Sequence, residues 1–178
     1  MISSDSTNTG VVFVVDDDEA MRNSLRWLIE SVGHTVETYA SAQAFLDNHY
    51  PGRSGCLLLD VRMPGMSGLE LQSQLESHDI RLPVIILTGH GDVGMAVKAM
   101  KAGALDFIEK PFKTDRLLLV LERAIADARL RREVEELRRR AGADVANVAA
   151  KGNERGDVEI HGGDVEGGRR EPLLCVLN

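Results

Sequence analysis

Cysteine, long apolar runs and positive charge are all scarce in this chain, and each shortage excludes a class of protein. The two cysteines, Cys56 and Cys175, lie far apart and form no Cys-x-x-Cys motif, so both suit a reduced cytoplasm. No apolar run approaches the ~20 residues that a membrane-spanning helix needs, so we expect a cytoplasmic protein with no membrane partner. The net charge of −7 argues against a protein that coats nucleic acid.

The length and composition fit one soluble domain with extra segments. The chain has 178 residues, of which 43% are hydrophobic and 28% are charged, as is typical of globular proteins. Residues 1–10 are rich in Ser, Thr and Asn and lack the basic and apolar parts of a signal peptide. We expect them to be a disordered N-terminus.

Four short apolar segments are each followed by a polar residue suited to phosphate chemistry. The segments 11–15, 56–59, 84–87 and 106–109 precede Asp16 and Asp17, Asp60, Thr88 and Lys110, respectively. In an open parallel sheet the carboxyl ends of the strands meet at one edge, where ligands bind. We therefore expect these polar residues to form a single site.

The residue types in that site indicate a metal ion and phosphoryl transfer. Carboxylates so close together are costly unless a cation compensates or a proton is shared. Oxygen ligands with no His or Cys nearby favour Mg²⁺. The Thr88 hydroxyl and the Lys110 ammonium are groups that hold the oxygens of a transferring phosphoryl group, and an Asp beside them can be the nucleophile that accepts it.

Taken singly, each of these residues has an ordinary structural explanation. An Asp after an apolar run is usually a helix N-cap or a turn residue, and Asp18 fits that description. Thr88 alone is typical of a turn, Lys110 of a solvated charge and Pro111 of a strand breaker. The combination of all four endings, in this order, is what favours a site.

At these motifs, residues 10 to about 125 resemble a bacterial response-regulator receiver domain, which is CheY-like. The stretch from Thr88 to Phe112 is most similar to the FixJ-type subgroup. The resemblance rests on Val-Val-Asp16-Asp17-Asp18, Leu-Leu-Asp60-Val-Arg-Met-Pro64-Gly-Met-Ser-Gly68, Thr88-Gly-His and Lys110-Pro111-Phe. It implies that a sensor histidine kinase phosphorylates Asp60.

The resemblance also implies the remaining roles. Mg²⁺ is held by Asp17, Asp60 and the backbone carbonyl of Arg62, and Asp16 assists through water. Lys110 and Thr88 act with Asp60 in phosphoryl transfer. Thr88 and Phe107 form a switch, and the Lys110–Pro111 peptide bond is cis. The protein is then no enzyme, beyond catalysing its own phosphorylation and slow dephosphorylation.

Alternating patterns predict five strand–helix units and an α/β fold. The order is that of a doubly wound, five-stranded parallel sheet of flavodoxin or CheY type, 2-1-3-4-5, with an extended last helix. The predicted strands are 11–16, 35–39, 56–60, 83–88 and 105–109, and the predicted helices are 18–32, 41–49, 67–77, 92–102 and one that begins after Thr114. The receiver domain is expected at 11–126, a helical linker at 127–140 and a disordered tail at 141–178.

The last helix is long, because no Gly or Pro interrupts Asp115 to Arg140. Its first half carries an apolar stripe that would pack on the sheet, formed by Leu117, Leu121, Ile125 and Ala128. Leu130, Val134 and Leu137 then continue a 4-3 spacing, which fits either an amphipathic helix that runs past the domain or a short coiled coil between two copies. Glutamates interrupt the arginines there, so a salt-bridged helix is expected rather than a nucleic-acid surface.

The segment after Arg140 has seven glycines, no aromatic residue and no lasting apolar period, which is typical of disorder. FixJ-type regulators usually carry a helix-turn-helix domain at this place, and its pattern is missing here. Either the chain is a stand-alone receiver or its output domain has been lost, for example by a frame change. We expect no specific DNA binding from this chain alone, but a phosphorylation-dependent homodimer or protein partner at the face formed by 92–102, 105–109 and the last helix.

Two other functions use similar residues. A phosphatase of the haloacid dehalogenase type has an Asp-x-Asp nucleophile motif, whereas Asp60 is followed by Val61 and Arg62, so the acid/base is missing. A receiver-shaped module that only binds partners would need none of the site residues. The kinase, its stimulus and the lifetime of the phosphorylated state are beyond what the sequence predicts.

Overall fold

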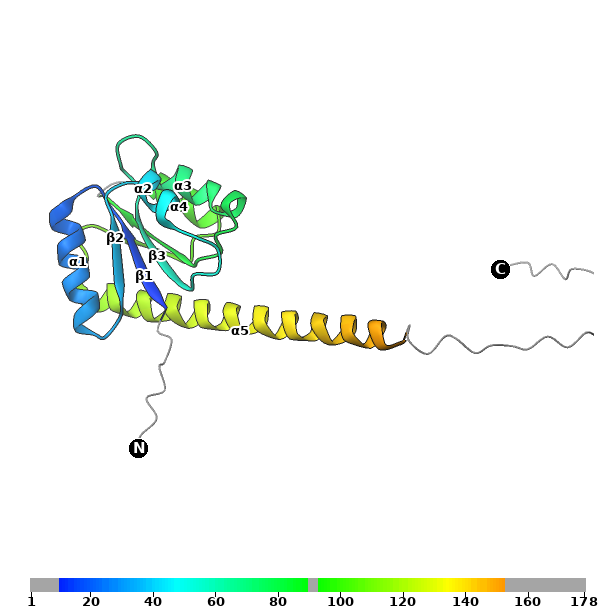
Figure 1. Cartoon of the computed structure of the whole chain (residues 1–178). Coiled ribbons are helices and arrows are strands. Elements are labelled where there is room, and N and C mark those ends of the chain that lie inside the picture. Colours follow the sequence, from blue (N-terminus) through cyan, green and yellow to red (C-terminus); the bar gives the residue numbers. More distant parts are fainter. Residues whose placement is uncertain (1–9, 90–92, 153–178) are drawn as a thin grey trace, which may run out of the picture. The chain divides into compact units, whose positions relative to one another are not determined.

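The protein contains one five-stranded parallel sheet in the predicted order, β2-β1-β3-β4-β5 (Figure 1). The structure is a computed structural model that describes residues 10–89 and 93–152, with side chains except those of Val93 and 142–152. The strands are β1 (Val11–Val15), β2 (Val36–Tyr39), β3 (Gly55–Asp60), β4 (Val84–Thr88) and β5 (Asp106–Glu109). The α/β class and the strand order predicted from the sequence are thus confirmed.

Helices cover both faces of the sheet, as a doubly wound fold requires. They are α1 (Glu19–Ser31), α2 (Ala42–Asn48), α3 (Gly68–Gln74), the 3₁₀ turn η1 (Glu76–His78), α4 (Val93–Lys101) and α5 (Thr114–Gly152). One core contains Phe45 of α2, Leu71 of α3 and Ala99 of α4, packed on one face of the sheet. The other core contains Leu25 of α1 and Leu117 of α5 on the opposite face.

The strands β1, β3 and β4 are apolar on both faces because each face packs against helices. Successive strand residues point to opposite faces, so Leu57 belongs to the first core and Leu58 to the second. In β3 and β4 the polar side chains therefore stand at the carboxyl ends of the strands, as Asp60 and Thr88 do.

Helix α1 begins and ends where local chemistry predicts. The side chain of Asp18 is the N-cap and accepts hydrogen bonds from the backbone N–H groups of Ala20 (2.8 Å) and Met21 (3.2 Å). Gly33 follows the helix at a φ of 89°, a left-handed conformation that glycine adopts without strain. The Asp18 cap was expected from the sequence, and it places the start of α1 directly beside Asp16 and Asp17.

The last helix differs from the prediction at both ends. It begins at Thr114 rather than after it, because the carbonyl of Lys113 already accepts from the N–H of Leu117 at 3.2 Å. It also runs to Gly152, although the tail from Ala141 was expected to be disordered. The segment 141–150 has five alanines, and alanine has the highest helix propensity. The rest of the expected tail, 153–178, and the expected disordered N-terminus lie outside the described residues, except for Gly10.

The one cysteine within the described residues lies in the sheet. Cys56 is fully buried in β3, and burial raises the pKa of its thiol to about 12. A thiol with that pKa is protonated at neutral pH and is therefore a poor nucleophile.

We predict that Cys56 will resist alkylation in the folded protein. In a Cys175→Ser variant at pH 8, iodoacetamide should modify the native protein at least about a thousandfold more slowly than a free thiol, because both access and ionisation are suppressed. The same variant in guanidinium chloride is the control and should be labelled completely. Native labelling at the rate of an exposed thiol, measured by intact mass, would contradict the burial of β3.

Candidate functional site

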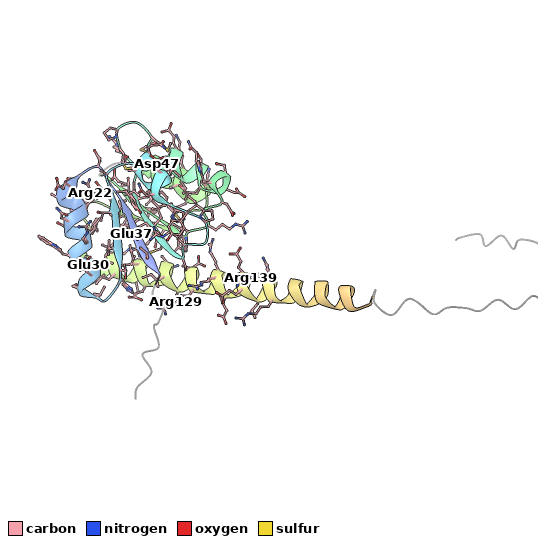
Figure 2. All side chains as sticks on the ribbon, in the orientation of Figure 1. Arg22, Glu30, Glu37, Asp47, Arg129 and Arg139 are labelled. Atoms are coloured by element: carbon pink, nitrogen blue, oxygen red, sulfur yellow. The ribbon has the colours of Figure 1, made fainter. Side chains whose placement is uncertain are left out.

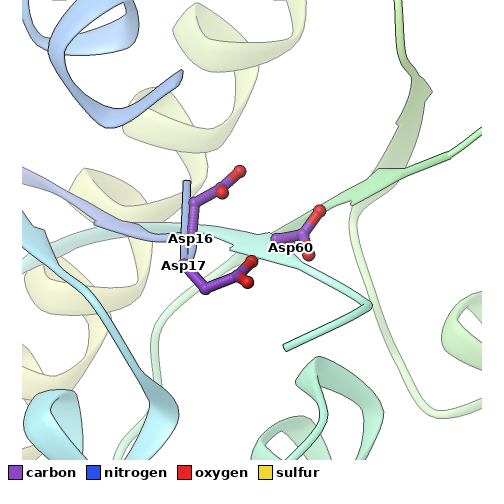
Figure 3. Close-up of side chains that lie close together, drawn as sticks. All are labelled: Asp16, Asp17 and Asp60. Atoms are coloured by element: carbon purple, nitrogen blue, oxygen red, sulfur yellow. The ribbon is translucent and has the colours of Figure 1, made fainter. Parts of the chain in front are cut away.

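Three carboxylates meet at the carboxyl ends of β1 and β3 (Figure 3). Oxygens of Asp16, Asp17 and Asp60 all lie within 4.8 Å of one another. Asp16 and Asp60 are buried, with exposed fractions of 1% and 6%, whereas Asp17 is exposed to solvent. The sequence predicted that these residues would meet only because each follows or ends a parallel strand. The structure places them in one cluster.

Lys110 lies between the two buried carboxylates. Its Nζ atom is 2.7 Å from Asp16 Oδ2 and 2.7 Å from Asp60 Oδ1. The side chain is positioned by its backbone, whose N–H donates to the carbonyl of Thr88 at 2.8 Å. The peptide bond between Lys110 and Pro111 is cis. The ammonium therefore contacts two residues that lie 94 and 50 positions before Lys110 in the chain.

The electrostatics of the site follow from burial and from this ion pair. Burial raises the pKa of Asp60, and the hydrogen bond and charge of Lys110 oppose that shift without cancelling it. Burial lowers the pKa of Lys110, but its hydrogen bonds to Asp16 and Asp60 outweigh burial and the net shift is upward. The ammonium is therefore held in its charged form, while the charged form of Asp60 is disfavoured.

The donor set fits a hard divalent cation. Three carboxylates and one ammonium give the cluster a net charge of 1 − 3 = −2 when all are ionised. A divalent ion would neutralise that charge, and oxygen ligands suit Mg²⁺ or Ca²⁺ rather than a softer metal. Asp17 is exposed, so it offers a ligand on the side that solvent and a phosphate group can reach.

The turn after β3 is shaped around Asp60. The Asp60 Oδ2 atom accepts from the backbone N–H of Arg62 at 2.9 Å, which brings the Arg62 backbone against the site. Helix α3 begins at Gly68, whose N–H donates to the carbonyl of Val61 at 3.0 Å. A Cβ atom at Gly68 would lie 2.1 Å from the carbonyl oxygen of Asp60, so no other residue fits this close approach.

The sequence did not indicate the role of Arg22. Its Nη1 atom donates to the carbonyl of Asp16 at 2.7 Å and to the carbonyl of Asp17 at 2.9 Å. The guanidinium thus holds the backbone of the acidic loop from the first turn of α1. The feature of the sequence that could have indicated this contact is an arginine five residues after the Asp16-Asp17 pair, on the helix that follows the pair.

Thr88 and Phe107 lie at the edge of the site that faces α4. Thr88 is 2% exposed, and its hydroxyl donates to the carbonyl of Gly89 at 3.3 Å. Phe107 pairs in register with Ile86, two residues before Thr88, so its side chain lies on the same face of the sheet as that of Thr88. The Phe107 ring is 41% exposed and lines a hollow with Ala96, Val97, Met100 and Lys101.

The protein-family model for the response regulator receiver domain matches residues 12–122. The chain belongs to the response regulator receiver family. It is 46% identical to the transcriptional regulatory protein FixJ of Bradyrhizobium diazoefficiens over 146 residues, which are 82% of this chain and 71% of that protein. It is 46% identical to the response regulator protein TodT of Pseudomonas putida over 67% of this chain and 53% of that protein.

Solved structures of relatives have the same fold. FixJ-N is 48% identical and superposes with a TM-score of 0.63, over 66% of this chain and 94% of that chain. The response regulator StyR is 45% identical with a TM-score of 0.70, over 74% of this chain and 67% of that chain. The curated relatives are longer proteins, because this chain spans 71% of one FixJ, 66% of a second and about half of TodT.

Within residues 10–89 and 93–152, no helix is both long and apolar enough to cross a membrane.

The metal fit can be tested at Asp17, the exposed ligand. We expect Mg²⁺ at ten times its dissociation constant to raise the free energy of unfolding of the protein by about 1.4 kcal/mol. Asp17→Ala should abolish that increase and should slightly stabilise the metal-free protein, because it removes carboxylate repulsion. Thermal unfolding with and without Mg²⁺ measures both effects.

Asp79→Asn is a matched control for that experiment. Asp79 is an exposed carboxylate that precedes β4, at the edge of the sheet opposite to the site, and its φ of 54° suits Asn. This variant should retain the full response to Mg²⁺. An equal response in Asp17→Ala would show that the ion binds elsewhere.

Proposed function

We propose that the protein is a phosphoacceptor of a two-component phosphorelay, in which Asp60 receives a phosphoryl group from the phosphohistidine of a sensor histidine kinase. The observation that carries the proposal is the placement of Asp60 at the end of β3, with the Lys110 ammonium 2.7 Å away and two more carboxylates beside it. The family and its FixJ-type relatives support the same role.

The transfer is a displacement at phosphorus. A carboxylate oxygen of Asp60 forms the new P–O bond while the P–N bond of the phosphohistidine breaks, and the electron pair of that bond stays on the imidazole. The product is an acyl phosphate on Asp60. Asp17, Asp60 and the Arg62 carbonyl are the residues that would hold Mg²⁺, with Asp16 acting through water, and the bound ion would supply positive charge next to the transferring oxygens.

Other groups of the site would orient the Asp60 carboxylate and stabilise the charge of the phosphoryl oxygens. The Lys110 ammonium contacts Asp60 in the structure and is close enough to contact a phosphoryl oxygen on it. The N–H of Arg62 fixes the second oxygen of the carboxylate. Arg22 holds the loop that carries Asp16 and Asp17.

Thr88 and Phe107 form the proposed switch. A phosphoryl oxygen on Asp60 is a stronger acceptor for the Thr88 hydroxyl than the Gly89 carbonyl, because it carries charge. Movement of Thr88 toward the phosphoryl group would free space on the α4 side of the sheet, and Phe107 would rotate from its exposed position into that space. Phosphorylation would then bias a two-state element.

The exposed apolar surface beside this switch is the proposed output. Val97, Met100 and Phe107 have exposed fractions of 48%, 41% and 41% on the face formed by α4, β5 and α5. A rotation of Phe107 would change that surface, and we propose that it then binds a second copy or a protein partner. Relatives include transcriptional regulatory proteins, so a role in transcription follows by similarity, but we assign no DNA binding to this chain.

Two alternatives are less well supported. A module that only binds partners would have no use for three carboxylates gathered around a lysine at a cost in repulsion. A phosphatase needs an acid/base two residues after the nucleophile, where this chain has Arg62. Receiver domains are in general not enzymes, and we propose the same here apart from autophosphorylation and its slow reversal.

The acceptor assignment is tested by removing the nucleophile. Treatment with acetyl phosphate and Mg²⁺ should add one phosphoryl group to the full chain, and Asp60→Asn should abolish the addition because an amide cannot form an acyl phosphate. Intact mass in acid measures the product. Asp47→Asn, an exposed carboxylate on α2, is the control and should be phosphorylated normally. Equal phosphorylation of Asp60→Asn would refute the assignment.

The absence of DNA binding is tested on the phosphorylated full chain. Rounds of selection from a random DNA pool at moderate salt should enrich no sequence, since most specific binders neutralise several phosphates with a basic surface and this chain carries a net charge of −7. Removal of 153–178 should leave the rate of phosphorylation unchanged. An enriched sequence whose binding is lost on that truncation would contradict this part of the proposal.

A further inference from the structure

Helix α5 carries two apolar stripes rather than one. The first packs on the sheet, and its members are 0–7% exposed: Leu117, Val120, Leu121, Ala124, Ile125 and Ala128. The second is formed by Leu119, Ala126, Leu130, Val134 and Leu137, all of which are exposed. We call this second set the outer stripe.

The outer stripe lies on the side of α5 that faces away from the sheet. At about 100° per residue, its five members project within about 40° of the direction of Leu130, and Leu121 projects about 180° away. The 4-3 spacing from Leu130 to Leu137 therefore does not continue the buried stripe, because the step of two residues from Ala128 to Leu130 crosses the helix. It continues the line that starts at Leu119, on the receiver body.

These side chains are large and well exposed. The exposed fractions are 60% for Leu119, 60% for Leu130, 39% for Val134 and 56% for Leu137. Single exposed apolar residues need no explanation, but a row of them from Leu119 to Leu137, along about five turns of the helix, marks a contact surface. Charged side chains such as Arg129 and Arg139 also project from this part of α5 (Figure 2).

We propose that the outer stripe of α5 binds the same stripe of a second copy of this chain, as a parallel two-stranded coiled coil. With Leu130 and Leu137 at d and Val134 at a, position g of this segment is Glu133 and the e positions are Arg131 and Arg138. In a parallel pair Glu133 of one copy lies next to Arg138 of the other, so the charges attract.

The charges also disfavour the antiparallel alternative. That arrangement brings e positions together and would place Arg131 of one copy near Arg138 of the other, which repel. Within each copy, Arg131 pairs with Asp127 at 2.7 Å and Arg132 with Glu136 at 3.1 Å, one turn along the same helix. These pairs support the helix in a single copy, while Glu133 and Arg138, five residues apart, do not face each other on one helix.

The contact between the Leu130–Leu137 segments of the two copies, which we call the seam, is too short to hold two copies together by itself. Leu130 to Leu137 covers about one heptad, whereas stable coiled coils need several. It would therefore act together with the contact proposed at the α4–β5–α5 face, which raises the effective concentration of one stripe near the other. The similarity to FixJ extends into this region, because an alignment of 146 residues must reach beyond residue 122, where the family match ends. The seam itself does not require that Asp60 accept phosphate.

The test is disulfide formation across the two-fold axis of the pair. In a Cys175→Ser background, Val134→Cys should oxidise to a covalent dimer at least tenfold faster than Glu135→Cys, since only position 134 lies on the seam. Buried Cys56 does not compete. Leu130→Glu in the Val134→Cys chain should reduce the rate at least tenfold. Circular dichroism should show unchanged helix content in each variant.

The experiment is run with and without acetyl phosphate, and the mass of each sample reports phosphorylation separately. If phosphorylation fails but Val134→Cys still cross-links, the seam stands and the phosphoacceptor proposal falls. Equal rates for positions 134 and 135 in both conditions would overturn the seam. A second sample carries Val134→Cys and keeps Cys175. A disulfide between these two cysteines within one chain would also overturn the seam, because the chain's own apolar segment 173–177 would then cover the stripe.

Discussion

The site depends on one interaction, the contact of the Lys110 ammonium with two buried carboxylates. Lys110 follows β5, Asp16 follows β1 and Asp60 ends β3, so three strands must be in place before the contact can form. Without the ammonium, Asp16 and Asp60 would be like charges in a buried environment, which is strongly unfavourable. With it, the carboxyl edge of the sheet is both held together and left with a surplus of negative charge.

That surplus links stability to function. A site with fully balanced charges would gain little from a divalent cation, whereas a cation bound here would offset the surplus and would supply the positive charge that the proposed phosphoryl group needs. The surrounding backbone is arranged to tolerate the imbalance: Arg22 holds the acidic loop, the N–H of Arg62 bonds to Asp60, and Gly68 allows α3 to begin against the end of β3. Functional sites commonly accept such a local cost, which the rest of the fold offsets.

Helix α5 connects the site to a surface of a different kind. The buried stripe of α5 completes one core of the receiver, so the position of the helix follows from its packing on the sheet. Its outer stripe starts at Leu119 on the same body and continues along the helix to Leu137. A helix that is apolar on two opposite sides can be covered on one side by its own domain and on the other by a second molecule.

The sequence by itself determined the class of fold and the members of the acidic site, because strand patterns and the residues that end strands are local. It also determined the cap at Asp18, for the same reason. The strand order was predicted from the type of fold that the strand patterns resemble. Only the tertiary structure decided which side of α5 Leu130 occupies, why position 68 must be glycine, and that Arg22 bonds to the acidic loop. Those facts depend on how each element is placed in space, even where the residues are only six positions apart, as Arg22 and Asp16 are. The helical segment 141–152 was not predicted, because the glycines after Arg140 favour disorder, whereas the alanines of 141–150 favour a helix.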